Sequence, residues 1–262
     1  MRSLNTAATG MVAQQANLDV ISNNLANVNT TGFKGAQAQF QDLIYQNRTL
    51  ATVAASGSAS SPISTQVGLG SMFSATSSNF SQGSLNMTGN PLNMAIQGQG
   101  FFKVQMPDGN FAYTRDGSFQ VDANGLVVTT NGYPLQPPIT VPLNASSITV
   151  NAQGQITVVQ PGSTDATTID PPVGITMFPN PGALERIGQN LFAPNTAAGS
   201  GTDGKAGENG SGTIVGGALE GSNVQVVQEM VNMIMAQRAY EINSKAIQTS
   251  DEMLQTVNGL KR

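Results

Sequence analysis

The start of the chain carries apolar residues at a seven-residue spacing. An a/d pattern of this kind predicts a helix over residues 1–28 with one narrow apolar stripe. Polar Gln14 occupies one slot of the stripe, and Gly32 is expected to end the helix. The apolar positions are Leu4, Ala7, Met11, Leu18, Ile21, Leu25 and Val28.

The end of the chain carries a second stripe, whose spacing is built from threes and fours. Ser222 or Asn223 is the expected N-cap, and no proline interrupts residues 195–262. We therefore predict a second helix, about 55–60 Å long. Its stripe consists of Val224, Val231, Met235, Ala239, Ile242, Ala246, Met253 and Leu260.

Between these ends, short alternating runs are separated by turn signals. Four runs, at residues 101–106, 111–114, 118–122 and 126–130, each precede an Asp-Gly or Asn-Gly dipeptide, and together they predict a β-meander. A hairpin is expected around Gly154, from residues 147–150 and 155–159, and a strand over 174–178. Residues 46–94 are expected to be irregular apart from a strand-like piece at 66–73. Residues 195–217 are expected to form a flexible loop.

These patterns predict an α+β protein with long N- and C-terminal helices that pack as a coiled-coil-like pair. The helices flank a central β-rich domain of antiparallel hairpins. The expected segments are an N-terminal helical assembly segment at 1–45, a Ser/Ala/Gly-rich linker region with short strands at 46–94, a β-rich outer domain at 95–218 and a C-terminal helical assembly segment at 219–262.

Both apolar stripes need a partner, because an isolated helix is marginal in water. The partner is either the other terminal helix of the same chain or helices of neighbouring subunits. The outer faces are rich in uncharged polar residues rather than in Glu and Lys, which favours packing between subunits. The residues expected to make that packing are Leu4, Met11, Leu18, Ile21, Leu25, Val28, Val224, Val231, Met235, Ala239, Ile242, Ala246, Met253 and Leu260.

The amino-acid composition excludes most kinds of catalytic site. The chain has no cysteine, histidine or tryptophan, and residues 49–102 contain no charged residue. Thiolate and imidazole catalysis and Cys/His metal sites are therefore excluded, and no metal or cofactor is expected. A net charge of −4 without a basic face argues against nucleic acid. Lys34 is expected to serve the carbonyls at the end of the first helix or a neighbour's surface, and Arg115-Asp116 to be a structural pair at a turn.

Two long segments at the ends resemble the signatures of the bacterial flagellar rod and hook axial protein family. The N-terminal signature matches residues 13–34, and the C-terminal one matches 219–224, 229–231 and 238–243. In the middle, residues 98–104, 112–119 and 184–192 resemble the distal-rod branch of that family, and the length of the chain agrees with it.

The resemblance implies a subunit of the distal rod of the basal body, which stacks helically into a hollow shaft and transmits torque to the hook. The terminal helices would line the export channel, and the β domain would form the outer layer. The implied partners are other copies of the chain, proximal rod proteins and hook protein at the two ends, and the surrounding rings and peptidoglycan. The subunit is expected to reach the periplasm through the flagellar type III export apparatus, without a cleavable signal peptide and without a transmembrane segment.

Three alternatives remain at the level of sequence. The chain could be a hook or proximal rod subunit of the same family, or a monomeric β-rich adhesin with a helical stalk. A wall-cutting enzyme is a third class, but no pair of carboxylates is placed convincingly for it.

Overall fold

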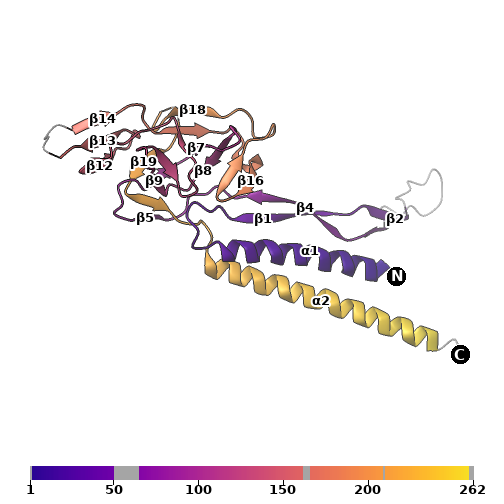
Figure 1. The fold of residues 1–262 in the computed structure, drawn as a ribbon. Helices are drawn as coiled ribbons and strands as arrows, with labels where there is room; N and C mark the ends of the chain where they lie inside the picture. Colours follow the sequence, from indigo (N-terminus) through magenta and orange to yellow (C-terminus); the bar gives the residue numbers. More distant parts are fainter. Residues whose placement is uncertain (1, 50–64, 162–165, 209, 260–262) are drawn as a thin grey trace, which may run out of the picture. The chain divides into compact units, whose positions relative to one another are not determined.

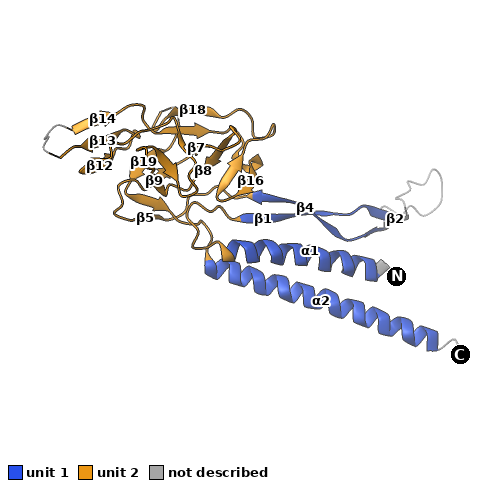
Figure 2. Ribbon diagram, in the orientation of Figure 1, with its two compact units in different colours: residues 1–25, 36–77, 226–262 blue, residues 26–35, 78–225 orange. Residues whose placement is uncertain are grey.

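The computed structural model describes residues 2–49, 65–161, 166–208 and 210–259, which form two α-helices, a short 3-10 helix (Pro181–Ala183) and a series of short strands (Figure 1). The chain divides into two compact units (Figure 2). Unit 1 comprises residues 1–25, 36–77 and 226–262, and unit 2 comprises residues 26–35 and 78–225. The predicted α+β class, with a helix at each end and antiparallel strands between them, is confirmed.

Unit 1 contains the two helices and two strand pairs. Helix α1 (Arg2–Ala26) lies between helix α2 (Val226–Gly259) and the ribbon formed by β1 (Ala36–Asp42) and β4 (Ser71–Ser78) (Figure 1). Strands β2 (Tyr45–Thr49) and β3 (Thr65–Gly68) pair antiparallel. The side chain of Asn24 holds β1 to α1, because it donates to Ala36 O at 2.8 Å and accepts from Ala36 N at 2.9 Å.

The ends of both helices differ from the prediction. Helix α1 stops at Ala26, so Gly32 is not its C-terminal residue. Gly32 has φ of +67°, and an added Cβ would lie 2.5 Å from Asp116 N, so glycine is required by a turn that packs on another backbone segment. Helix α2 begins at Val226, so neither Ser222 nor Asn223 is its N-cap. Ser222 Oγ instead accepts a hydrogen bond from Val224 N at 3.2 Å.

Unit 2 is built from antiparallel strands. Its largest sheet has five strands in the order β11-β7-β8-β17-β16, a second has the order β12-β13-β14, and four further pairs are β10-β9, β15-β18, β19-β6 and β20-β5. The strand bounds are β5 (Leu85–Met87), β6 (Met94–Gln97), β7 (Phe102–Gln105), β8 (Phe111–Thr114), β9 (Phe119–Val121), β10 (Val127–Thr129), β11 (Leu135–Gln136), β12 (Ser147–Val150), β13 (Ile156–Val159), β14 (Ala166–Ile169), β15 (Gly174–Met177), β16 (Glu185–Gly188), β17 (Leu191–Ala193), β18 (Thr202–Lys205), β19 (Thr213–Gly216) and β20 (Ala218–Glu220).

The predicted hairpins are confirmed, but the predicted meander is wrong. Strands β7 and β8 pair across the turn at Gly109, and β9 and β10 pair across Gly125, with both glycines at φ near +80°. The strand next to β8 is β17, however, and β9 and β10 form a separate sheet. Gly117, between β8 and β9, does not have a positive φ. The chain passes against β6 there, and an added Cβ would lie 1.5 Å from Met94 O.

Two segments expected to be irregular contain strands. Within residues 46–94, β3 and β4 replace the single strand expected at 66–73 because the chain turns at Gly70, and β5 follows; residues 50–64 lie outside the described part. Within 195–217, β18 pairs with β15 and β19 pairs with β6. The glycine-rich composition gave no local signal for these strands, because they form by pairing with partners that lie far away in the sequence.

Two apolar clusters hold unit 2 together. The larger one joins most of the strands and includes Phe102 and Phe119, whose rings meet edge to face at 5.1 Å. The smaller one is aromatic, and Phe101, Phe178 and Phe192 are among its members. Both clusters consist of residues of unit 2, so the main apolar core of the described chain belongs to this unit.

We expect the substitution Gly117→Ala to destabilise unit 2 by more than about 2 kcal/mol, because the new methyl group collides with backbone that cannot move away. Gly204→Ala is the matched control, since Gly204 has an ordinary φ and nothing within 4 Å of the added Cβ. Denaturant unfolding, followed by the tyrosine signal, measures both variants. Equal midpoints for the two variants would contradict the close approach at Met94.

Candidate functional site: assembly surfaces and tail junction

The contact between α1 and α2 is made by small and polar residues. The hydroxyl groups of Ser3 and Ser250 lie 3.5 Å apart, and a Cβ added to Gly10 would lie 2.9 Å from Asn243 Nδ2. From the first pair to the second, the residue number rises by seven in α1 and falls by seven in α2, so the two helices run antiparallel. The coiled-coil-like packing predicted for the apolar stripes is therefore not confirmed within the chain.

A groove of about 480 Å³ separates the two helices at the end where α2 begins. Its walls are mixed: polar Gln14, Asn17, Asn24, Glu229 and Asn232 alternate with apolar residues that include Val20, Ile21, Met235, Ala236 and Ala239. An open groove of this size leaves the intramolecular helix pair incompletely packed along this stretch.

The predicted stripe of α1 is partly covered in the chain. Ile21 is buried, and Leu4, Met11, Leu18 and Leu25 are half-buried. Val28 lies beyond the end of α1 and is also half-buried.

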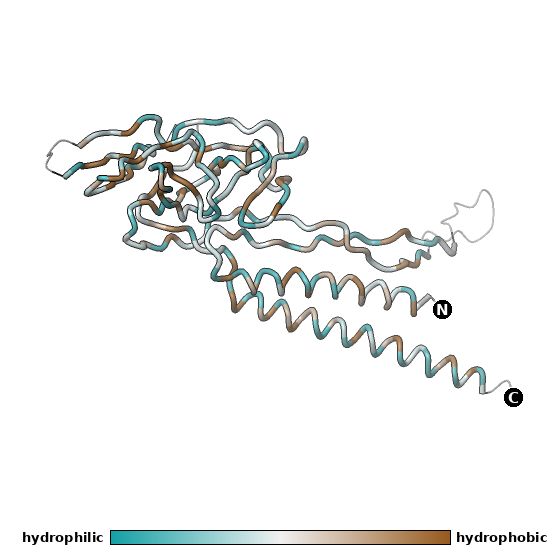
Figure 3. Tube along the Cα trace, in the orientation of Figure 1, coloured by the Kyte–Doolittle hydropathy of each residue, from teal (hydrophilic) through white to brown (hydrophobic). Residues whose placement is uncertain are grey.

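The predicted stripe of α2 is exposed along most of its length, although Met235 and Ala239 also line the groove beside α1. The exposed fractions are 45% for Val231, 58% for Met235, 68% for Ile242 and 61% for Met253. Ala246 is also exposed, whereas Ala239 and Val224 are half-buried, Val224 lies before the start of the helix, and Leu260 lies outside the described residues. Figure 3 shows hydrophobic positions recurring along the trace of α2. The side chains that α2 buries are those of Ala236 and Ser250.

The ribbon in unit 1 presents a second group of exposed apolar side chains, which the sequence analysis missed. Phe40 of β1 and Phe73 of β4 have ring centroids 6.1 Å apart, and both are exposed, as are Ile44, Tyr45 and Met72. The alternation of Phe40 with polar neighbours was the available signal for this ribbon.

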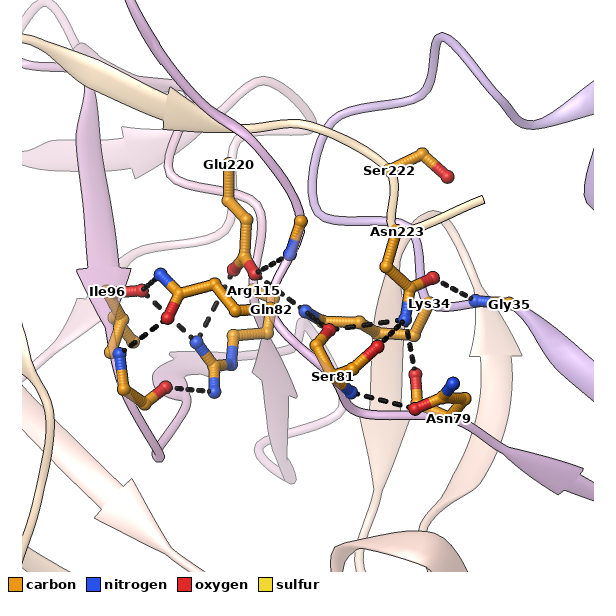
Figure 4. Close-up of polar contacts among 12 residues, drawn as sticks. Lys34, Gly35, Asn79, Ser81, Gln82, Ile96, Arg115, Glu220, Ser222 and Asn223 are labelled. Atoms are coloured by element: carbon orange, nitrogen blue, oxygen red, sulfur yellow. Dashed lines mark hydrogen bonds and ion pairs between the residues drawn. The ribbon is translucent and has the colours of Figure 1, made fainter. Parts of the chain in front are cut away.

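In unit 2, a buried ion network joins the segment that follows α1 to the segment that precedes α2 (Figure 4). Lys34 Nζ lies 2.7 Å from Glu220 Oε1, and the side chains of both residues are 0% exposed. Arg115 Nη1 lies 3.4 Å from Glu220 Oε2. We call Lys34, Arg115 and Glu220 the clasp.

Backbone groups complete the partners of the clasp. Lys34 Nζ also donates to Ser81 O at 2.9 Å, and Gly83 N donates to Glu220 Oε1 at 3.0 Å. Arg115 donates to Ile96 O at 3.3 Å and to Gly98 O at 2.7 Å. The clasp thus gathers four stretches of chain around one carboxylate.

Further hydrogen bonds fasten the same two segments beside the clasp. Asn223 Oδ1 accepts from Gly35 N at 2.7 Å, and Asn223 Nδ2 donates to Asn79 O at 2.8 Å (Figure 4). Gly32 N donates to Glu220 O at 2.8 Å. Arg186 of β16 donates to Lys34 O and stacks over the ring of Phe33.

Burial dominates the electrostatics of the clasp. Desolvation lowers the pKa of Lys34, the hydrogen bond and charge of Glu220 oppose that change, and the charge of Arg115 adds to it. Desolvation also lowers the pKa of Arg115, again opposed by Glu220. The side chains of Lys34 and Arg115 thus share the carboxylate of Glu220 at a site that is almost closed to solvent.

The roles expected for Lys34 and Arg115-Asp116 need correction. Lys34 does not serve the end of α1, because its ammonium group is buried against Glu220. Arg115 is structural, as expected, but its ionic partner is Glu220; Asp116 accepts instead from Ser118 and Thr31. Lys34 and Glu220 each stand inside one of the two terminal signatures, and that joint placement was the available signal.

The described residues offer little for other chemistry. No group of three acidic, His or Cys side chains among them is placed to hold a metal ion. No helix in the described part of the chain is both long enough and apolar enough to cross a membrane.

Three family models match the chain, at its two ends and in its middle. The model described as flagella basal body rod protein matches residues 4–34, and the flagellar basal body rod FlgEFG protein C-terminal model matches residues 215–260. The flagellar hook protein FlgE/F/G D1 domain model matches residues 95–158. Both terminal signatures noted in the sequence lie within or overlap these matches.

Curated relatives align along the full length of the chain. Flagellar basal-body rod protein FlgG of Borreliella burgdorferi is 47% identical over 100% of this chain and 99% of the relative. The protein of the same name from Caulobacter vibrioides is 43% identical over 100% of both chains, and that from Bacillus subtilis is 37% identical over 100% of both. The chain therefore belongs to the flagellar basal-body rod protein family and is a structural subunit of the flagellar basal body, not an enzyme.

Proposed function

We propose that this subunit polymerises helically into the hollow distal rod and transmits torque to the hook. The observation that carries the proposal is the exposed apolar stripe of α2, with Met235 and Ile242 at its centre. A helix exposing such a stripe to water would gain roughly 25 cal/mol for each Å² of apolar surface that a neighbouring subunit covers. In a polymer that gain is repeated in every subunit.

The predicted packing residues of α1 and α2 keep their role in this proposal. Leu4, Met11, Leu18 and Leu25 retain uncovered apolar surface, and the polar contact between α1 and α2 leaves both helices available to other subunits. The Met-rich part of α2, with Met230, Met233 and Met235, suits contacts with neighbours that are not identically placed, because the thioether side chain is adaptable.

Assignment to the distal rod rests on the middle of the chain and on length. Relatives named FlgG align from end to end with this chain. The partners we propose are further copies of the chain, proximal rod proteins at one end and hook protein at the other, with rings and peptidoglycan nearby. We also propose that the subunit crosses to the periplasm by the flagellar type III export route, without a cleavable signal peptide.

Electron microscopy of polymer grown from the purified full-length chain tests this proposal. We expect straight, stiff filaments with a central channel. Curved, flexible filaments would instead favour a hook subunit, and a chain that remains monomeric at millimolar concentration would contradict polymerisation.

A further inference from the structure

The clasp stands where both terminal helices are connected to unit 2. We call residues 31–35 the N-root and residues 220–223 the C-root. In the sequence, the N-root follows the end of α1 at Ala26, and the C-root precedes the start of α2 at Val226. Lys34 and Glu220 are 186 residues apart in the sequence, yet Lys34 Nζ lies 2.7 Å from Glu220 Oε1, so this ion pair directly links the two roots.

Stability alone does not explain why this contact is ionic. Moving charges out of water costs several kcal/mol for each ion, and well-packed apolar side chains of similar volume often serve stability equally well or better. The clasp also has one cation more than it has carboxylates, and within the described residues Arg115 Nε is buried without a hydrogen-bond partner. Both features lower the stability that the contact can contribute.

The hydrogen bonds and ion pairs of the clasp are directional, so they define one arrangement of its three side chains. Glu220 Oε1 accepts from Lys34 Nζ and Gly83 N, while Oε2 faces Arg115. A shift of either root would leave a buried charge unpaired, whereas apolar side chains tolerate small displacements. Two neutral hydrogen bonds also connect the roots: Gly35 N donates to Asn223 Oδ1, and Gly32 N donates to Glu220 O.

We propose that Lys34, Arg115 and Glu220 are positioning residues that hold the N-root and the C-root at one fixed separation. The two assembly helices then start from a defined pair of points in every subunit. This role in assembly rests on the proposed polymerisation, but the root separation is a property of the single chain and is measurable without polymer.

The chain contains no cysteine, so two labels can be introduced without background. Cysteines replacing Asn29 and Gln225, both exposed and both in unit 2, carry spin labels in the full-length chain, and dipolar EPR reports their distance distribution. The test variant is the triple substitution Lys34→Met, Arg115→Met and Glu220→Met, which removes every charge of the clasp. Lys103→Met is the matched control, because it breaks another ion pair of unit 2, Lys103–Asp203, at 2.6 Å.

We expect the triple variant to keep a folded unit 2, judged by its tyrosine near-UV signal, while its root distance distribution widens at least twofold. Unlabelled triple variant should show a critical concentration for polymerisation at least tenfold higher than that of the parent chain. The control should change neither quantity. A folded triple variant with a narrow distribution, or with unchanged assembly, would overturn the proposal.

If the triple variant does not fold, the double substitution Lys34→Met and Glu220→Gln decides the matter, because it leaves one cation, Arg115, which still donates to Ile96 O and Gly98 O. The same widening and the same rise in critical concentration are expected for it. If neither variant folds, the clasp serves folding as a whole and the positioning role is wrong. If the parent chain itself forms no polymer, the proposed function fails, while the distance measurement still judges the root separation.

Discussion

Replacing Ile242 with Asp should strongly weaken polymerisation while leaving unit 2 folded. The Ile242 side chain is 68% exposed in the single chain, so the substitution costs little before assembly. In a polymer that covers the stripe, the new carboxylate would be buried without a partner, at about 3 kcal/mol or more per subunit. Sedimentation should therefore show a critical concentration at least about 100-fold higher than that of the parent chain.

Gln237→Asp is the matched control on the same helix. Gln237 is also exposed and lies about 140° around the helix from Ile242, outside the apolar stripe. Both substitutions introduce Asp and change the helix propensity by comparable amounts. They differ in the face of α2 that receives the carboxylate. If Ile242→Asp polymerised as readily as Gln237→Asp, the α2 stripe would not be an assembly surface.

In the dilute monomer, the helices of unit 1 should exchange their amide hydrogens rapidly. The described helices bury few side chains, among them Ala7, Ala13, Ile21 and Ala236, and isolated helices with so little tertiary support are marginal in water. We expect protection below about tenfold in residues 2–25 and 226–259, against more than about a thousandfold in β7 and β8.

The sharper part of this prediction is the position along the chain at which amide protection begins. The N-root and the C-root belong to unit 2 and are held by buried hydrogen bonds, including that from Gly32 N to Glu220 O. They should therefore stay protected although the helices beside them in the sequence do not. Hydrogen exchange followed by mass spectrometry at micromolar concentration measures the protection of the helices and that of the two roots. Strong protection throughout α2 in a proven monomer would contradict the account.

Local signals predicted the elements that depend on nearby residues. The Asp-Gly and Asn-Gly turns located the hairpins of β7 with β8 and β9 with β10, because turn chemistry is decided within a few residues. The apolar periodicity located both helices for the same reason. The helix ends were misplaced because Gly32 and Asn223, which resembled capping residues, are used in contacts with distant segments.

Features that depend on distant residues could not be predicted. The partner of β8 is β17 rather than β9, and the glycine-rich 195–217 segment contains strands only because β15 and β6 lie beside it. The clasp is the clearest example, because neither Lys34 nor Glu220 has a charged partner nearby in the sequence. The periodic pattern predicted helix α2, but it did not predict that Asn243 and Ser250 would lie on the face that meets α1.

The central claim is that the exposed stripe of α2 becomes buried between subunits. A single cysteine replacing Met235 reports this directly, because the parent chain has no other thiol. The rate at which that thiol reacts with a maleimide should be high in the monomer, where Met235 is 58% exposed, and should fall at least tenfold in the polymer. An unchanged rate in well-formed polymer would show that α2 leaves its apolar face in solvent, and would contradict the assembly described here.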